Sequence, residues 1–484
     1  MLAFKEKIMT RKYIAILFIF LLSACTDILD QEPLGILDAG AFLNTVSDAR
    51  QAVNAAYEPL LINNNNNNFY WAFGVVASDN AIAGGDGSRR GIEEIDFFEQ
   101  TPRTEELNDF WKLQYAGIVQ ANTVIEQVPN IEGDETLKNN IIGEALFLRA
   151  WYHFLLAQVF GDIPLAIEIL PPDEVRIPRT PRAQVYEQIV LDCERAADLL
   201  PASYPASEIG RVASGAALAL KAKTHIYQEN WQEALNTVAE IKNLGIYGLM
   251  ENYQDNFTEG LQNNQESVWE IQHANLELGV GNNINQWWTS QKIEDGYGFA
   301  EASPEFAEAF EPGDPREGFT IAQNNDEYLG RIYKRSFSST GFGPVKFLQS
   351  IEEVSQISDG SINYPAIRFA EVLLWEAEAL AELGRTNEAL IPLEAVRARA
   401  RNQSEDPNTV LPEITTTNQE ELIDLIRHER RVELGYEFHR FFDLVRWGIA
   451  GQLMEDFQVG KHEYFPLPQA ELDLNNLLTQ NPGY

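Results

Sequence analysis

The chain has 484 residues, of which 45% are hydrophobic, and its formal net charge at pH 7 is −37. A chain of this length can bury a large core. Proteins that hold DNA or RNA present basic surfaces, so this charge argues against a nucleic-acid partner and against simple adsorption to an anionic lipid surface.

The first element in chain order is a secretion signal over residues 1–24. Arg11 and Lys12 precede an apolar run over residues 13–22. This run is too short to span a bilayer as a helix, but it has the length of a signal-peptide core. Met9 competes with Met1 as the true start, because the positive segment that follows Met9 is more compact.

The signal ends in a lipobox-like sequence, Leu22-Ser23-Ala24-Cys25. Small residues before the cysteine let the processing peptidase approach, and Cys25 would become the acylated first residue. The alternative is a plain secretion signal with a chance cysteine. We expect residues 25–40 to form a lipidated tether and residues 41–484 to form a single domain.

An irregular first insert is expected over residues 63–104. It opens with six consecutive asparagines, Asn63 to Asn68, which indicate a flexible loop tip. Trp71 follows in FYWAFGVV and fits a buried helix or strand better than a ligand contact. Arg89 and Arg90 lie in a glycine-flanked loop, either as solvated charges or as ligand contacts.

Helical periodicity dominates the chain and predicts a mostly α fold with minor β structure. Segments 143–166, 215–241 and 368–400 are typical of tetratricopeptide helix pairs, and a fourth pair is expected to begin at residues 111–128. The second and third pairs align over their length, although they lie 155 residues apart. We therefore predict a helix-pair scaffold over about residues 111–241 and 368–450, interrupted by long inserts.

A second insert is expected over residues 245–365, where glycine, asparagine and aromatic residues replace the helical pattern. It contains the adjacent pair Trp287 and Trp288, and Tyr297 between two glycines on a flexible hairpin-like segment. Cys193, in contrast, lies on the apolar face of a predicted helix and is expected to be a buried, inert thiol.

The last segment, residues 424–484, is dense in alternating charges and closes with LLTQNPGY. Its arginines and acids recur at spacings of three and four, which would stack opposite charges on neighbouring helix turns. A catalytic role for Glu429, Glu433 and Asp443 is the alternative, but arginine–carboxylate links are the favoured interpretation. Arg440 and Asp443 are expected to lock the fold.

No cofactor is predicted. The six histidines form no close metal pattern, so a metal site is not expected. Calcium in the Asp/Asn-rich loop 79–86 stays open, although this loop lacks the spacing of an EF-hand.

An ordered series of motifs gives the chain a resemblance to the SusD/RagB family of Bacteroidetes surface lipoproteins. The matching pieces are Leu22–Cys25, Ser78-Asp79-Asn80, EFAEAFEPGDPR ending at Arg316, RFAEVLLWEAEAL from Arg368, RHERRVEL from Arg427, RFFDLVRW from Arg440, and the terminal QNPGY. They run through essentially the whole chain. One departure is Phe438, where the family usually has a glycine after the glutamate.

The resemblance implies a tetratricopeptide scaffold whose loops carry a ligand platform. It implies a lipid anchor in the outer membrane, facing the cell exterior, and a SusC-like TonB-dependent transporter as partner. Members of this family bind glycans without cleaving them, and a minority handles peptides. Asp79 matches a recurring acidic position at which a similar residue hydrogen-bonds the ligand in some members.

These implications combine with the aromatic inserts into a function hypothesis. Flat aromatic rings suit the C–H faces of sugars, so Trp287, Trp288 and Tyr297 are candidate glycan contacts, with Trp71 as a further candidate. Asp79, Arg89 and Arg90 would supply hydrogen bonds. The acidic chain favours a neutral polysaccharide such as a β-glucan. A peptide-binding protein and a secreted glycoside hydrolase are the alternatives.

Overall fold

Eleven helices of at least seven residues organise the part of the chain that the computed structural model describes, residues 43–484 except 64 and 294. The signal, the lipobox with Cys25 and the tether therefore lie outside the described residues. These helices are α3 (Val46–Tyr57), α4 (Arg90–Asp96), α5 (Glu105–Gln127), α6 (Glu135–Phe160), α7 (Arg182–Leu199), α8 (Ser214–Tyr227), α9 (Trp231–Asn243), α13 (Phe369–Glu382), α14 (Thr386–Gln403) and α15 (Gln419–Glu433), with α16 (Arg440–Arg446) as a short addition.

Helix α6 is the longest of these and shows why the chain forms long helices. The Asp134 side chain accepts a hydrogen bond from the Leu137 backbone at 2.9 Å and so caps the first turn. Gly161, at φ 75°, ends the helix in a conformation that suits glycine. The segment 143–166, expected to be a helix pair, is mostly the second half of this one helix, so that prediction is wrong. The apolar run covers all sides of α6, and neighbouring helices bury it.

The second and third predicted pairs correspond to the helices α8–α9 and α13–α14. Helix α13 begins and ends 155 residues after α8, and α14 begins 155 residues after α9. The aligned alanines Ala222 and Ala377 are both fully buried. Small residues at such positions let two helices approach closely.

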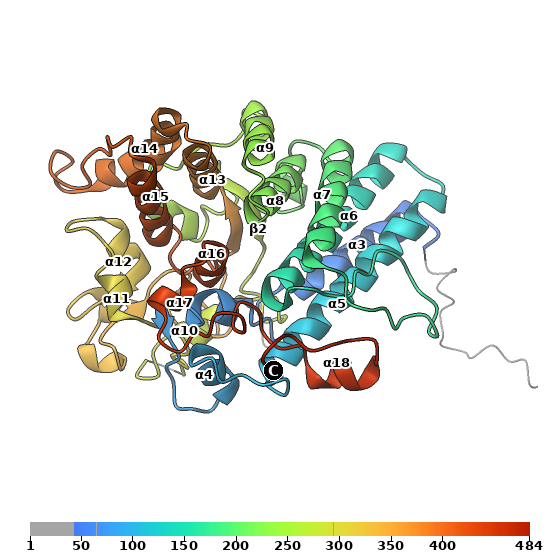
Figure 1. Cartoon of the computed structure of the whole chain (residues 1–484), viewed down its shortest axis with the longest axis horizontal. Coiled ribbons are helices and arrows are strands. Elements are labelled where there is room, and N and C mark those ends of the chain that lie inside the picture. Colours follow the sequence, from blue (N-terminus) through green and yellow to red (C-terminus); the bar gives the residue numbers. More distant parts are fainter. Residues whose placement is uncertain (1–42, 64, 294) are drawn as a thin grey trace, which may run out of the picture. The chain divides into compact units, whose positions relative to one another are not determined.

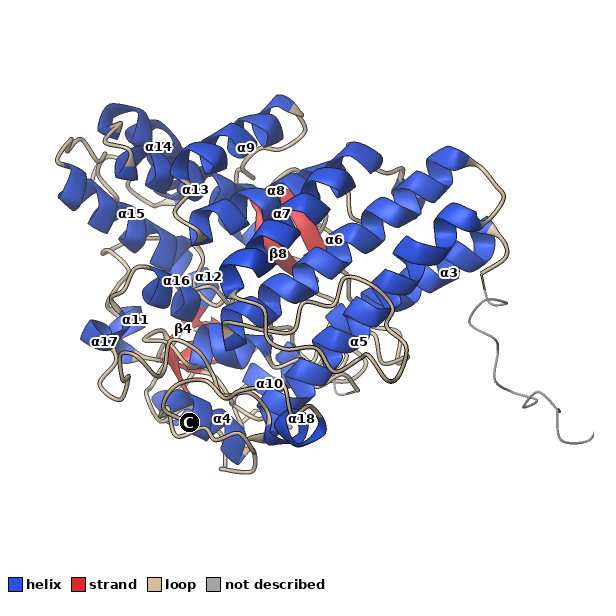
Figure 2. Cartoon of the chain, turned by 45° about the vertical axis from the view of Figure 1, so that its right-hand side comes forward, coloured by secondary structure: helices blue, strands red, loops and turns tan. Residues whose placement is uncertain are grey.

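These pairs are far apart in sequence but adjacent in space. Helix α9 packs against α13, so the array runs from α3, α5 and α6 through α7, α8 and α9 to α13, α14 and α15 (Figure 1). The second insert leaves this array and returns through a two-stranded stem, β2 (Ser267–Ile271) with β8 (Tyr364–Arg368), paired antiparallel. The strands are short and lie between helices (Figure 2). This arrangement agrees with the expected helix scaffold interrupted by inserts.

The inserts carry only short elements, of which α10, α11 and α12 lie lower than α13, α14 and α15 in the view of Figure 1. They are α10 (Ile284–Trp288), α11 (Pro304–Ala307), α12 (Arg316–Thr320), β1 (Ala81–Ile82), β3 (Glu301–Ala302), β4 (Ile321–Ala322), β5 (Glu327–Tyr328), β6 (Arg331–Ile332), β7 (Gly343–Pro344) and a five-residue π-helix, Ala72–Val76. The remaining short helices, α17 (Ala450–Leu453) and α18 (Gln469–Leu474), follow α16.

The asparagine run is built into the fold and is not a free loop tip. Asn63 is 3% exposed and donates to the Gly279 carbonyl at 2.6 Å, in the second insert. Asn66 donates to the Glu58 carbonyl at 2.7 Å, and Asn68 is buried. Asparagine amides satisfy backbone groups that regular structure leaves open, which composition alone does not reveal.

Phe438, the departure from the usual glycine, keeps the turn at φ 67°. A phenylalanine in this region is strained, whereas a glycine is not. Its ring stacks on Tyr364 with centroids 4.3 Å apart and is 1% exposed. The burial of the ring offsets the backbone strain, and the local turn is therefore retained.

The terminal peptide is fixed to the body of the fold, as its sequence suggested. Asn481 donates to the carbonyls of Phe160 at 3.0 Å and Phe465 at 2.7 Å. The Tyr484 hydroxyl accepts from the Gln100 side chain at 2.8 Å. The last residues thus join the end of α6 to the first insert.

Candidate functional site

The two inserts meet at a pair of short strands that lie more than 200 residues apart in the chain. Strand β1 pairs antiparallel with β3, with Ala81 opposite Ala302. Beyond this pair the backbones touch, because a Cβ added at Gly84 would lie 2.2 Å from the Gly298 carbonyl oxygen. Only glycine permits this approach. We call residues 83–90 and 296–301 the loop face.

Arg89 is a partly exposed cation of the loop face with partners on several segments. Its guanidinium carbon lies 4.9 Å from the centroid of the Phe69 ring, and its Nη1 lies 3.6 Å from Glu106 Oε1. Phe69 in turn stacks on Trp287, with ring centroids 5.5 Å apart. Arg89 therefore caps an aromatic stack and presents hydrogen-bond donors at a defined place.

Arg90 differs from its neighbour. Its side chain is 79% exposed and pairs with Glu94 at 3.1 Å, one helix turn away. Such exposed pairs contribute little to stability. Arg90 is a solvated charge at the start of α4, at the edge of the loop face.

Tyr297 is the aromatic residue that the loop face leaves open. It is 39% exposed, and its ring lies against Phe299 with centroids 5.2 Å apart. The segment is not a free hairpin, because Tyr297 N donates to the Gln286 carbonyl at 2.9 Å and Phe299 N to the Trp287 carbonyl at 2.7 Å. Helix α10 thus holds the ring in place.

The tryptophans lie inside the molecule, which corrects the expectation that Trp287 or Trp288 contacts a ligand. Trp71, Trp287 and Trp288 are 0%, 3% and 1% exposed. Trp287 packs on Phe69 of the first insert, and Trp288 packs edge-on to Tyr436 at 5.1 Å. Helix α10 is covered on both sides, so adjacent residues are both buried. For Trp71, the favoured core position is confirmed.

Asp79 also points inward, toward arginines of the C-terminal segment. Its carboxylate accepts from Arg440 at 2.7 and 2.8 Å, and Arg431 lies 3.0 Å away. Burial alone would raise the pKa of Asp79, but the hydrogen bonds and charge of Arg440 outweigh it, so the pKa lies below its usual value. Asp79 therefore forms an ion pair inside the molecule, and its carboxylate does not take the expected position of a ligand contact. The same ion pair is the contact through which Arg440 can lock the fold, as expected.

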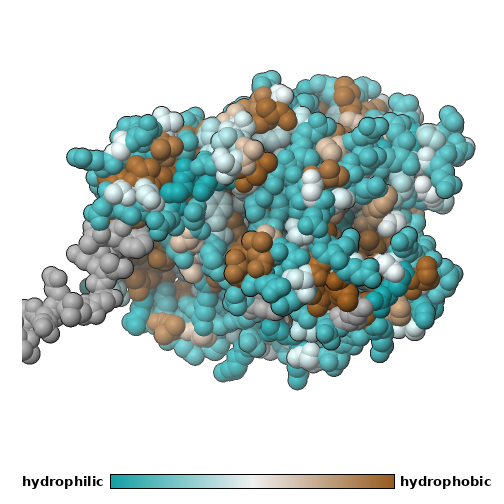
Figure 3. Space-filling view, turned by 180° about the vertical axis from the view of Figure 1, so that it is seen from behind, coloured by the Kyte–Doolittle hydropathy of each residue, from teal (hydrophilic) through white to brown (hydrophobic). Residues whose placement is uncertain are grey.

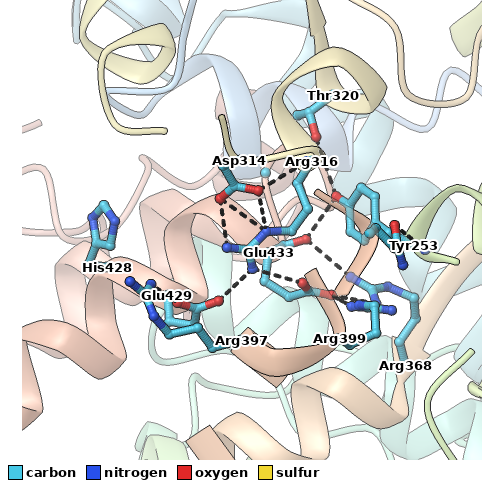
Figure 4. A network of polar contacts seen from close by, with 12 residues as sticks. Tyr253, Asp314, Arg316, Thr320, Arg368, Arg397, Arg399, His428, Glu429 and Glu433 are labelled. Atoms are coloured by element: carbon cyan, nitrogen blue, oxygen red, sulfur yellow. Dashed lines mark hydrogen bonds and ion pairs between the residues drawn. The ribbon is translucent and has the colours of Figure 1, made fainter. Parts of the chain in front are cut away.

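A buried ion network surrounds Glu433 (Figure 4). Glu433 faces three guanidinium groups, with Arg316 and Arg368 at 3.1 Å and Arg399 closer still. Burial opposes ionisation, yet these arginines hold the pKa of Glu433 far below its usual range. Such a carboxylate is permanently ionised, which suits a structural link and not a general acid.

The partners in this network come mostly from distant elements. Glu429 binds Arg316 of α12 and Arg397 of α14, and Arg430 binds Glu371 of α13 and Asp443 of α16. The expectation of charge pairs on neighbouring turns of one helix is therefore wrong for these residues. Asp443 with Arg446, at 2.9 Å, does follow the expected spacing.

Metal chemistry finds little support in the described residues. No group of three or more His, Cys, Asp or Glu side chains among them is placed to hold an ion. In the loop 79–86, the Asp79 carboxylate is already bound to arginines, so it cannot serve calcium. Cys193 is buried, and burial raises the pKa of its thiol, as expected for an inert residue.

Sequence reasoning missed two residues that build the loop face, Phe69 and Glu106. Glu106 is 2% exposed, its Oε2 has no hydrogen-bond partner among the described residues, and burial raises its pKa. It faces Arg89 from the first turn of α5. No sequence pattern marks either residue, because both act through contacts with Arg89. Arg89 lies 20 positions after Phe69 and 17 positions before Glu106.

Two family models match this chain. The model described as the SusD family matches residues 265–462, and the model described as "Starch-binding associating with outer membrane" matches residues 42–226. The chain belongs to the SusD family. A SusD-like protein of Formosa agariphila is 26% identical over 97% of this chain and 98% of that one.

Solved SusD structures share the fold. A laminarin-binding SusD-like protein is 28% identical and has a TM-score of 0.79, over 91% of this chain and all of that one. A SusD-like carbohydrate-binding protein from Bacteroides fragilis is 25% identical and has a TM-score of 0.80, over 90% of this chain and all of that one. Within the described part of this SusD chain, no helix has the length and apolar character needed to cross a membrane.

Proposed function

We propose that this SusD protein binds a neutral polysaccharide or oligosaccharide at the cell surface, on the loop face, without cleaving it. The observation that carries the proposal is the joining of both inserts by the β1–β3 pair, next to segments that hold the exposed Tyr297 ring and the partly exposed Arg89 guanidinium. Membership of the SusD family and the likeness to a laminarin-binding protein support it.

The chemistry of the loop face suits sugar hydroxyls and sugar rings. The Tyr297 ring, held by α10, offers an apolar surface to a C–H face at little cost in side-chain entropy. Arg89 offers donors, and the exposed Ser88 and Asp86 offer a hydroxyl and a carboxylate. The buried Trp287 packs on Phe69, and the Phe69 ring in turn lies against the Arg89 guanidinium, so Trp287 supports the position of Arg89.

A binding role fits the carboxylates better than hydrolysis does. Hydrolysis of glycosides needs two carboxyl groups about 5–10 Å apart, one of them with a raised pKa. The buried carboxylates of the network are neutralised by arginines, as at Glu433 and Glu429. Glu106 and Asp96 both have raised pKa values, but Glu106 faces Arg89, and the Asp96 carboxylate accepts a hydrogen bond from Ala83 N.

The net charge of −37 favours neutral ligands over polyanions. Laminarin, a neutral β-glucan, is the first candidate because a 28% identical protein binds it. We propose further that the protein delivers its ligand to a SusC-like TonB-dependent transporter. We also propose that a lipid anchor at Cys25 holds it in the outer membrane, where it faces the cell exterior. Co-purification of a TonB-dependent transporter with the tagged lipoprotein would test the partner.

The test is affinity electrophoresis against laminarin, a panel of other neutral polysaccharides, and alginate as a polyanion. Tyr297→Ala should weaken binding about tenfold, equal to a loss of about 1.4 kcal/mol, because it removes the stacking ring. Tyr297→Phe keeps the ring and should bind normally. Ile391→Ala, 72% exposed on α14, is the matched control.

Three results would overturn the proposal. The first is that Tyr297→Ala and Arg89→Ala both bind the polysaccharide panel as tightly as the wild type does. The second is that the protein binds tryptic peptides but no glycan, which would favour the peptide alternative. Release of reducing sugar from a bound polysaccharide would favour the hydrolase.

A further inference from the structure

Asp96, the last residue of α4, ties the loop of residues 83–90 at its base. Its Oδ2 accepts a hydrogen bond from Ala83 N at 2.8 Å, so the end of the helix is joined to the residue that follows β1. The loop and α4 together run from one end of this hydrogen bond to the other. The contact therefore fixes the place at which the loop leaves the β1–β3 pair.

Helix α4 is the fixed side of this contact, and the loop is the side that can move. Ile95 of the helix is 0% exposed, and Phe98, just after the helix, stacks on His462 with ring centroids 5.0 Å apart. Three of the eight residues in the loop are glycines, which have no side chains to pack. Loss of the Asp96 contact would displace the loop and leave the helix in place.

The base of the loop lies where the two inserts touch. A Cβ added at Gly84 would lie 2.2 Å from the Gly298 carbonyl oxygen, and one added at Gly85 would lie 3.0 Å from the Tyr297 carbonyl oxygen. Arg89 lies at the other end of the same loop. A displacement that begins at Ala83 would therefore change both halves of the loop face.

Asp96 occupies this position among like charges. The charged groups that act on it are Glu93, one turn back on α4, and Asp456 of the segment after α17, and both are acids. His462 of that segment supplies no positive charge near pH 7, because burial lowers the pKa of its ring. A half-buried carboxyl group beside two acids favours its protonated form.

The charged residues of the loop do not offset this. Arg89 faces an acid of α5, and Arg90 pairs with an acid of α4. Asp86 is exposed and accepts a hydrogen bond from Ser88 N at 2.9 Å. Within the described part of the chain, Asp96 thus has no cation as a partner, and its contact with the loop is a hydrogen bond to the backbone.

The protonation of Asp96 is linked to the position of the loop. With the loop in place, burial and the two nearby acids raise the pKa of Asp96 to about 7. With the loop displaced, the carboxyl group would be solvated, and its pKa would approach ~4, the ordinary value of an aspartate. The state with the loop in place binds the proton more tightly. A rise in pH from about 4 to about 7 therefore favours displacement, by at most about tenfold for each pH unit.

We propose that the Asp96–Ala83 contact is a pH-sensitive closure of the loop face. The protonated carboxyl group keeps an acceptor oxygen for Ala83 N and holds residues 83–90 against the second insert. Ionisation of Asp96 releases this loop, so the affinity for a glycan falls as the pH rises. The effect on affinity rests on the proposed function, whereas the release of the loop does not.

The test is hydrogen exchange of the whole chain, measured by mass spectrometry on peptides that cover residues 83–90. Rates at pH 5 and pH 8 are each divided by the intrinsic exchange rate at that pH, so that only the change in protection remains. In the wild type, the protection of this segment should fall about tenfold or more between the two pH values, whereas the protection of α6 should stay the same.

Asp96→Asn is the decisive variant, because an amide has the size of the protonated carboxyl group and keeps an acceptor for Ala83 N. Its protection at residues 83–90 should be equal at both pH values. Asp456→Asn removes one of the two like charges, so its loss of protection should lie between those of the wild type and Asp96→Asn. Asp198→Asn, exposed on α7, is the matched control and should behave as the wild type does.

Affinity electrophoresis against laminarin at the same two pH values tests the consequence for binding. The wild type should bind at least about threefold more weakly at pH 8 than at pH 5, and Asp96→Asn should bind equally at both. Protection that falls equally in the wild type and in Asp96→Asn would overturn the inference, as would a wild-type laminarin affinity that is the same at both pH values. A wild type that binds no laminarin at either pH would contradict the proposed function, and the exchange of residues 83–90 would still decide the role of Asp96.

Discussion

The ion network around Glu433 and the loop face both contain arginines, but these arginines differ in how they are held. In the network, Glu433 faces three guanidinium groups and Glu429 faces two. On the loop face, the Arg90 side chain is 79% exposed and pairs with Glu94, and Arg89 lies 3.6 Å from Glu106. The buried charges therefore bind one another and stabilise the fold, whereas the charges of the loop face stay open to solvent and to a ligand.

The network should show the largest effect on stability. Glu433→Gln leaves Arg316, Arg368 and Arg399 buried beside a neutral amide, so we expect a loss of roughly 3–5 kcal/mol in the free energy of unfolding. Urea unfolding of the purified variant measures it. Glu388→Gln, from the exposed Arg385–Glu388 pair, is the control and should change little. A cost for Glu433→Gln as small as that of the control would contradict the structural role.

Trp288→Ala should cost a similar amount, about 3–5 kcal/mol, because the ring is 1% exposed within an aromatic cluster. Tyr297→Ala should leave the melting temperature nearly unchanged and weaken glycan binding instead. Calorimetry and affinity electrophoresis of both variants sharpen the contrast between core and surface. A stable Trp288→Ala protein with lost binding would reverse these assignments.

Arg440→Ala should cost roughly 2–4 kcal/mol, since it leaves the Asp79 carboxylate with Arg431 alone. The pKa of Asp79 is lowered in the folded protein, so the stability from this pair is present above its unfolded pKa and is lost as the pH falls through the folded value. Thermal melts at pH 7 and pH 3 test this. Wild type and variant should differ at neutral pH and converge in acid.

The smallest effect is expected at Asp96, which accepts a hydrogen bond from Ala83 N at 2.8 Å and so anchors the loop face. Burial raises the pKa of Asp96 to about 7. The folded state therefore binds the proton more tightly, and stability falls as the pH rises from about 4 toward 7. Asp96→Asn should melt a degree or two above wild type at pH 8, and the two should converge near pH 4. An equal difference at both values would exclude this titration.

The scaffold was predictable where the helical pattern repeats. Ala222 and Ala377 occupy matching positions, and their helices share boundaries. Segment 143–166 was misread because α6 is apolar all round, and such a pattern does not tell one long helix from two packed ones. The asparagine run was misread because its amides bond to backbone far along the chain, as Asn63 does to Gly279.

Much of the candidate site could not be predicted from residue type. Tyr297 was identified, and its ring is exposed, but Trp287 and Trp288 looked equally available in the same insert. The difference arises from what covers them, namely Phe69 and Tyr436. Arg89 was named as a candidate, but its position on Phe69 depends on a contact between residues 20 positions apart.

The sequence by itself determined the family, the helical scaffold and the existence of two irregular inserts, because these depend on local periodicity and on ordered motifs. Only the tertiary structure decided which polar groups bind one another inside the molecule. Asp79 and Glu433 find arginines from distant segments, whereas the exposed Arg90 pairs only one helix turn away, with Glu94. Whether a charge stabilises the fold or is left to meet a ligand depends on its neighbours in space, and those are set by packing over long sequence distances.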